Sequence, residues 1–168
     1  MLLLLYHGCM RISEIVKSPK NNHALKLCNV RVLSKHNKPL ALSLTLESFK
    51  HSTQPVSFKI KKNENPQLCP VKTVIDYVSV RGYEPGPLFI NKNSKPTNRQ
   101  FLVVHLKNWI KELGLSPISY NTHSLRIGRA TDMAAAGVPD QVIKATGRWK
   151  SDAFARYIRF DNFTVPHV

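Results

Sequence analysis

The sequence predicts an α+β fold: a mostly helical single domain with a small three-stranded antiparallel sheet near its N-terminus. Two observations lead to this prediction. Apolar residues follow helical spacing over most of the chain, with proline, glycine or a capping residue at the segment borders. Between residues 25 and 62 they instead alternate with polar residues, as in half-buried strands. The 168 residues are enough for one domain of ordinary size.

The first helix is expected over residues 1–16, where apolar residues are nearly continuous and then settle into helical spacing. The stretch lacks the basic start and the small-residue cleavage site of a signal peptide. We therefore expect a buried helix in a protein that is not secreted. Because the chain starts inside a hydrophobic helix, we also expect an N-terminally truncated domain.

Three strands are expected over residues 25–32, 41–49 and 55–61. In the last two, apolar and polar residues alternate with a period of two. The apolar positions are Leu42, Leu44 and Leu46, then Val56, Phe58 and Ile60. Residues 50–54 are then the hairpin loop between two strands, and this loop projects Lys50 from the sheet.

The rest of the chain is expected to be helical. Proline in the first turn and glycine or a polar cap at the ends mark the borders. The expected helices span residues 70–80, 97–113, 121–136, 139–147 and 151–160.

The charge balance points to a polyanionic partner. Lysine and arginine number 25 against 10 acidic residues, which gives a net charge of +15 and a pI near 10.1. Nucleic acid is the leading candidate. No apolar stretch is long enough to span a membrane. Three cysteines without a C-x-x-C pair indicate neither a disulfide framework nor a zinc module, so a reducing compartment is the simpler interpretation.

His123 and Arg126 form an H-x-x-R element at the start of a predicted helix. At this spacing the two side chains share a face, and free backbone N–H groups of the helix start point the same way. This arrangement outlines an anion site. The alternative is an ordinary helix start with two surface polar residues.

Tyr157 is the second candidate. Four cationic residues surround it in the sequence: Arg148, Lys150, Arg156 and Arg159. Positive neighbours favour the phenolate form, so this tyrosine is a candidate nucleophile. The alternative is a half-buried packing residue beside a solvated basic face.

Three segments in order, residues 8–15, 123–126 and 147–157, together resemble the signature of tyrosine recombinases, the phage integrase family. The resemblance implies a catalytic domain over residues 1–160 and a short C-terminal tail over residues 161–168. Residues 147–159 look most like recombinases of eukaryotic mobile elements of the DIRS and Crypton kind.

The resemblance makes Arg11 and Arg126 the two arginines that hold the phosphate, and His123 the first residue of the H-x-x-R element. The chemistry agrees, because a planar guanidinium can give paired hydrogen bonds to the charged oxygens of a phosphodiester. Lys50 matches the lysine that the family places in a strand hairpin as general acid for the departing 5′ oxygen.

The resemblance leaves one position open. Trp149 is the familiar substitute for a histidine that many members carry, and we expect it to donate its indole N–H near the phosphate. Arg148 is the alternative, because it lies nine residues before Tyr157. Glu14 is expected to orient a basic residue of the site.

The implied activity is site-specific DNA recombination. Tyr157 attacks a phosphodiester, forms a 3′-phosphotyrosyl link and releases a 5′ hydroxyl. The resemblance implies no cofactor and no metal. It also implies double-stranded DNA as partner, a homotetramer on DNA, and a nuclear location in a eukaryote or a cytoplasmic one otherwise.

Two other functions stay open at this point. The chain could be a catalytically inactive remnant that only binds DNA. Alternatively, residues 121–160 could be a helix-turn-helix regulator whose Pro139 helix enters the major groove. The second alternative gives no role to Arg11 or to the sheet.

Overall fold

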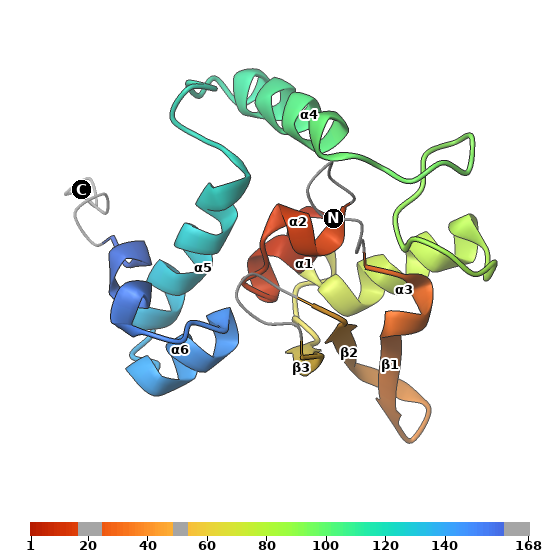
Figure 1. Cartoon of the computed structure of the whole chain (residues 1–168), viewed down its shortest axis with the longest axis horizontal. Helices are drawn as coiled ribbons and strands as arrows, with labels where there is room; N and C mark the ends of the chain where they lie inside the picture. The colour runs from red at the N-terminus through yellow and green to blue at the C-terminus, as the bar shows by residue number, and fades with distance from the viewer. Residues whose placement is uncertain (17–24, 49–53, 160–168) are drawn as a thin grey trace.

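The computed structural model describes residues 1–16, 25–48 and 54–159 (Figure 1). Its helices are α1 (Leu2–His7), α2 (Ile12–Ile15), α3 (Pro70–Arg81), α4 (Arg99–Glu112), α5 (Thr122–Ala135) and α6 (Asp140–Gly147). Three 3₁₀ helices are η1 (Leu27–Asn29), η2 (Pro66–Leu68) and η3 (Asp152–Tyr157). The strands are β1 (Val30–Lys35), β2 (Lys38–Leu46) and β3 (Val56–Lys61).

The predicted three-stranded antiparallel sheet is confirmed, with the strand order β1-β2-β3. Leu44 in the central strand pairs with Val30 on one side and Phe58 on the other. Leu42, Leu44 and Leu46 are all buried, as their period-two spacing predicts. The first strand begins at Val30 instead of residue 25, because residues 27–29 form the 3₁₀ turn η1.

The prediction of one helix over residues 1–16 was wrong. The chain leaves the helix after His7, and Cys9 adopts a left-handed conformation with φ of 45° before α2 begins at Ile12. Gly8 lies so close to the sheet that a Cβ there would be 2.9 Å from Cδ1 of Ile60. The break turns the carbonyl groups of Gly8 and Cys9 toward arginine side chains from the far end of the chain.

The helices from α3 to α6 lie within two residues of their predicted bounds. The last predicted helix differs: it is the short 3₁₀ helix η3, which ends at Tyr157. The hydroxyl of Thr131 donates to the carbonyl oxygen of Tyr157 and accepts from the amide of Arg159. These two bonds hold the chain in an extended course after η3, so it does not continue as a helix.

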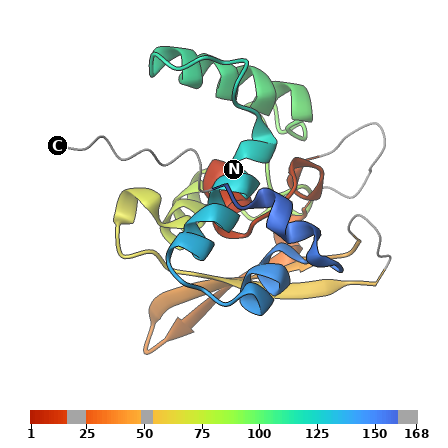
Figure 2. The same cartoon turned by 90° about the vertical axis from the view of Figure 1, so that its left-hand side faces the viewer.

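Two apolar clusters form the core. The larger one joins α1, α2, the sheet and α3, with Leu5, Leu42, Leu44 and Val71 at most 1% exposed. The smaller one joins α5, α6 and η3 around Ile143, and Trp149 and Tyr157 belong to it. Helix α5 packs against α1, and Figures 1 and 2 show α5, α6 and η3 gathered on one side of the molecule. In the described part of the chain, no helix is long and apolar enough to cross a membrane.

Candidate active site

Glu14 lies at the centre of the candidate site, only 3% exposed. Its carboxylate accepts from the backbone N–H of Arg11 at 2.9 Å and from Nη1 of the Arg11 side chain at 3.2 Å. It also accepts from Nη2 of Arg148 at 2.8 Å. One buried carboxylate therefore connects two arginines that are far apart in the sequence.

Arg148 fastens the C-terminal end of α6 to the break between α1 and α2. Its guanidinium donates to the carbonyl oxygen of Gly8 at 3.1 Å and to that of Cys9 at 3.4 Å. The backbone of Arg148 is left-handed, with φ of 56°. A non-glycine residue in this conformation costs of order 1 kcal/mol, which the hydrogen bonds of its side chain offset. Its Cζ lies 4.4 Å from the ring centre of Phe58 on β3.

Arg126 on α5 is fully buried, with 0% of its surface exposed. It donates from Nη2 to the carbonyl oxygen of Gly147 at 2.6 Å and from Nη1 to that of Cys9. Its Cζ lies 4.1 Å from the ring centre of Trp149. Burial lowers the pKa of Arg126, and the nearby positive charge of Arg11 lowers it further. This arginine is thus held by the protein itself on both sides.

Tyr157 at the end of η3 is half-buried against the same residues. Its ring centre lies 5.0 Å from the ring centres of His123 and of Trp149. The Cζ of Arg126 is 5.5 Å from the same ring. Both members of the H-x-x-R element therefore contact the tyrosine, which is consistent with the predicted shared face.

The sequence predicts free backbone N–H groups at the start of α5, but two of them are already bonded to Asn121. Asn121 caps the helix: its side-chain oxygen accepts from the amide of His123 at 2.8 Å, and its carbonyl oxygen accepts from the amide of Ser124 at 3.0 Å. The side chains of His123 and Arg126, not the helix start, therefore face Tyr157.

Trp149 and Arg148 are the two candidates for the place of the histidine that many family members carry. Both side chains lie at the site. Trp149 is 9% exposed and packs between Arg126, Tyr157 and Phe154. Its indole N–H is buried and has no hydrogen-bond acceptor in the described structure. Arg148 is instead occupied with Glu14 and backbone carbonyl groups.

These side chains form one connected group, which we call the arginine–tyrosine cluster: Arg11, Glu14, His123, Arg126, Arg148, Trp149 and Tyr157. Three guanidinium groups in it are balanced by a single carboxylate. Nε of Arg126, Nε of Arg148 and Nε1 of Trp149 are buried donors without a partner in the described structure. Buried donors are rarely left unpaired, so the excess of cations and of donors suits an anionic ligand.

Lys50 lies outside the described residues, and its predicted place at the site stays a prediction. Residues 8 and 9 were not predicted to belong to the site, but their carbonyl groups accept from Arg148 and Arg126. A glycine that interrupts a nearly continuous apolar run was the one available signal.

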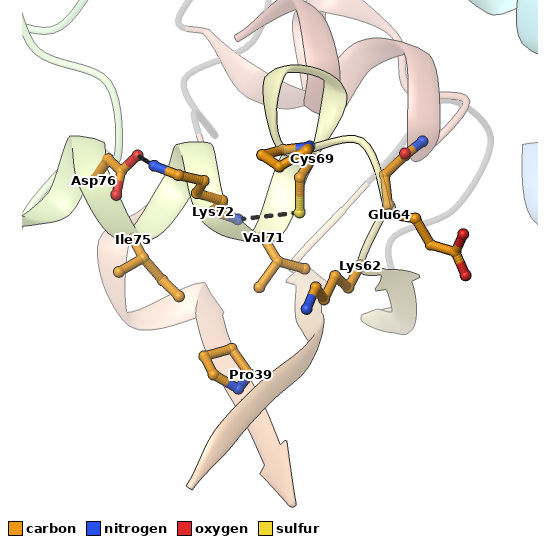
Figure 3. A pocket seen from close by; sticks show the side chains of 10 residues that line it. Pro39, Lys62, Glu64, Cys69, Val71, Lys72, Ile75 and Asp76 are labelled. Carbon is orange, nitrogen blue, oxygen red and sulfur yellow. Dashed lines mark hydrogen bonds and ion pairs between the residues drawn. The ribbon is translucent and has the colours of Figure 1, made fainter.

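Among the predicted site residues that the structure describes, none lines the pocket shown in Figure 3, which has a volume of about 340 Å³. It lies between α3 and the sheet, where the Sγ of Cys69 accepts from the backbone N–H of Lys72 at 3.4 Å. Among residues 1–16, 25–48 and 54–159, no three His, Cys, Asp or Glu side chains gather as a metal site.

The sequence matches the family described as "Phage integrase family" over residues 1–161. The chain belongs to the phage integrase family. No curated protein sequence matches it. Solved structures with the same fold include XerH site-specific recombinase bound to difH substrate in a pre-cleavage complex, with 15% identity and a TM-score of 0.64. That alignment covers 93% of this chain and 40% of XerH.

Two further solved structures share the fold. A post-cleavage complex of XerH with palindromic difH substrate has 15% identity and a TM-score of 0.68, over 96% of this chain and 41% of that one. The Tn1549 transposon integrase in complex with circular intermediate DNA has 19% identity and a TM-score of 0.56, over 96% and 53%. The chain thus spans about half or less of the length of these neighbours.

Proposed function

We propose that this chain is the catalytic part of a site-specific DNA recombinase, with Tyr157 as nucleophile. Residues 1–160 form the catalytic domain and residues 161–168 a C-terminal tail. The observation that carries the proposal is the arginine–tyrosine cluster. Arg11 and Arg148 share the buried carboxylate of Glu14, and Arg126 lies next to them at the carbonyl group of Cys9. A half-buried phenol and three unpaired donors lie beside these arginines. The neighbours of known structure, which were solved with DNA, support the same substrate.

In the proposed reaction the Tyr157 oxygen attacks a backbone phosphorus atom, and the bond from phosphorus to the 5′ oxygen breaks. The 5′ oxygen leaves as a hydroxyl after it takes a proton, for which we propose Lys50 as the donor. The phenol proton must also leave, and we propose the imidazole of His123 as its acceptor. The ring centres of His123 and Tyr157 are 5.0 Å apart. The phosphotyrosyl bond keeps the bond energy, so a DNA 5′ hydroxyl can reverse the step.

We assign the charge that develops on the nonbridging oxygens to Arg11 and Arg126. Arg11 has 19% of its side chain exposed, and one of its guanidinium nitrogens donates to Glu14. Among the described residues no other acceptor takes its guanidinium donors, which leaves them for a ligand. The indole N–H of Trp149 is a third donor. Glu14 and Arg148 are positioning residues, because they hold Arg11 and the break at Cys9.

The test is a DNA duplex that carries a nick near the crossover point, so that the cleaved strand diffuses away and the covalent product accumulates. The expected result is a protein–DNA adduct that survives denaturation and is absent in Tyr157→Phe. A matched control is Tyr120→Phe, because Tyr120 is exposed and lies outside the cluster. A folded, DNA-bound wild-type chain that forms no adduct contradicts the catalytic proposal.

One observation favours a second candidate function, a recombinase remnant that binds DNA without cutting it. The Arg126 guanidinium is fully buried, and backbone carbonyl groups already take two of its donors. It must leave these partners, or the carbonyl groups must move, before it can hold a phosphate. In this case DNA affinity still falls steeply with salt, but the nicked duplex gives no adduct.

The helix-turn-helix alternative does not fit. Arg126 in α5 donates to the carbonyl oxygen of Cys9, and Arg148 binds Glu14. Residues 121–159 therefore pack into the N-terminal part and do not form a separate module.

We also propose the element type, the assembly and the location that the family resemblance implies. These are an affiliation with DIRS- or Crypton-type elements, a homotetramer on DNA, and a nuclear location in a eukaryotic host or a cytoplasmic one otherwise.

A further inference from the structure

A second cationic site lies outside the arginine–tyrosine cluster. A cavity of about 410 Å³ runs along β3 and reaches α5 and α6. Strand β3 is one of the two edge strands of the sheet, and Figure 1 shows it as the strand nearest to α6. The cavity shares no lining residue with the cluster, so the proposed cleavage chemistry does not account for it.

All charged residues that the structure describes in its lining are basic. Lys59, Lys61 and Lys62 come from β3 and the residue after it, His7 from α1 and Arg129 from α5. No aspartate or glutamate is among the described residues that line it. The Nε of Arg129 is buried and has no acceptor in the described structure. Three lysines and Arg129 thus face one space that has no carboxylate among its described lining residues. Asp132 accepts from the hydroxyl of Tyr6, which also interacts with Arg129, but Asp132 does not line the cavity.

The rest of the lining is apolar. Ile60 and Met133 are buried, and Val142 of α6 and Val138 of the loop before α6 add further apolar surface. A flat surface that follows a DNA backbone needs only cations. A hollow that combines cations with an apolar wall suits a ligand with an anionic group and a flat or apolar body, and its volume is in the range of small-ligand sites.

We propose that this cavity, which we call the basic cavity, binds a phosphate ester. The phosphate lies against the lysines and Arg129, and the organic part lies against Val138 and Val142. The phosphate ester is either a free nucleotide or a nucleotide unit of bound DNA, since both present the same chemistry.

The test is titration calorimetry on the full chain at fixed ionic strength, with AMP and inorganic phosphate as separate probes. Both are expected to bind, and AMP more tightly, because only AMP reaches the apolar wall. The variant Lys59→Gln/Lys61→Gln is expected to weaken AMP binding about tenfold, since each lost charged hydrogen bond is costly. Val142→Ser should weaken AMP and leave inorganic phosphate unchanged.

The matched control is Lys35→Gln/Lys38→Gln, which removes two exposed lysines at the β1–β2 turn and gives the same net charge. It should bind AMP as the wild type does. If the two double variants weaken AMP equally, the effect is general electrostatics and the proposal is wrong. It is equally wrong if AMP does not bind the wild type.

A short duplex without a cleavage site separates the two sources of the phosphate. Displacement of AMP by the duplex identifies a DNA nucleotide as the ligand, whereas simultaneous binding identifies a free nucleotide. Tyr157→Phe should bind AMP normally, so this result is independent of whether the chain cleaves DNA.

Discussion

The ring of Trp149 occupies the space that a side chain on Gly147 would need. A Cβ built on Gly147 would lie 1.7 Å from Cζ3 of Trp149, far inside van der Waals contact. The same ring carries the Arg126 guanidinium on its face. The glycine is therefore what allows the tryptophan to lie between α6 and the candidate nucleophile.

The first prediction follows from this contact. Gly147→Ala should lower the free energy of unfolding by about 2 kcal/mol, because the Trp149 ring must move and repack. Gly128→Ala is the control, since a Cβ there meets only Cε2 of Tyr6 at an ordinary 3.8 Å. That change in the middle of α5 should stabilise by up to about 1 kcal/mol. Equal urea midpoints for the two variants would contradict the packing described above.

The second prediction concerns the buried guanidinium. Arg126→Lys should lower the free energy of unfolding by about 3 kcal/mol, because a lysine cannot donate to the carbonyl groups of Cys9 and Gly147 at once and loses the stacking on Trp149. Arg11→Lys, at a side chain that is 19% exposed, should cost about 1 kcal/mol or less. Denaturant unfolding of both variants measures the difference.

A small effect of Arg126→Lys on stability would have a specific meaning. The guanidinium would then not be held by the carbonyl groups in solution, and would be available to a phosphate. The same measurement therefore bears on whether the chain cleaves DNA or only binds it.

The third prediction tests the carboxylate at the centre of the cluster. Glu14→Gln should destabilise the fold by about 3 kcal/mol, because Arg11 and Arg148 lose their buried counter-charge. The double variant Glu14→Gln/Arg148→Met should lose less free energy of unfolding than the two single variants together. The reason is that it no longer contains the Arg148 guanidinium that Glu14→Gln leaves without its carboxylate. A double-mutant cycle in urea gives this coupling energy, and strict additivity would refute the contact.

The sequence predicted the sheet and most helices well, because these depend on local patterns. Leu42, Leu44 and Leu46 alternate with polar residues, and Asn121 is a good helix cap, so neighbours alone determine the local structure. Gly8 is the one local sign of a break after α1, but the geometry of that break could not be predicted. It depends on Arg126 and Arg148, which are 117 to 140 residues away along the chain from the carbonyl groups they bind.

In the candidate site too, the residue types could be predicted from the sequence, whereas the directions of their side chains could not. The order of the motifs led to Arg11, Arg126 and Tyr157. Folding places the Cζ of Arg126 5.5 Å from the ring centre of Tyr157. Arg148 and Trp149 lie next to each other before Tyr157, and their spacing does not reveal which side chain points into the site. The sequence alone therefore presents them as alternatives. The left-handed backbone at Arg148 sends the two neighbours to different partners, so both reach the site.

The last prediction is a pH dependence that arises at His7. Burial lowers the pKa of His7 below its usual 6.5, and the positive charge of Arg129 lowers it further. Below pH 6.5 the unfolded chain therefore binds a proton at this position that the folded chain does not. The resulting stability is complete above pH 6.5 and is lost as the pH falls from 6.5 through the lowered pKa. His7→Gln should remove this part of the decline between pH 7.5 and 5.5 in urea unfolding. If wild type and variant instead lose stability in parallel over that range, His7 has the same pKa in the folded and the unfolded chain. Burial and the charge of Arg129 then do not lower it, and the prediction is wrong.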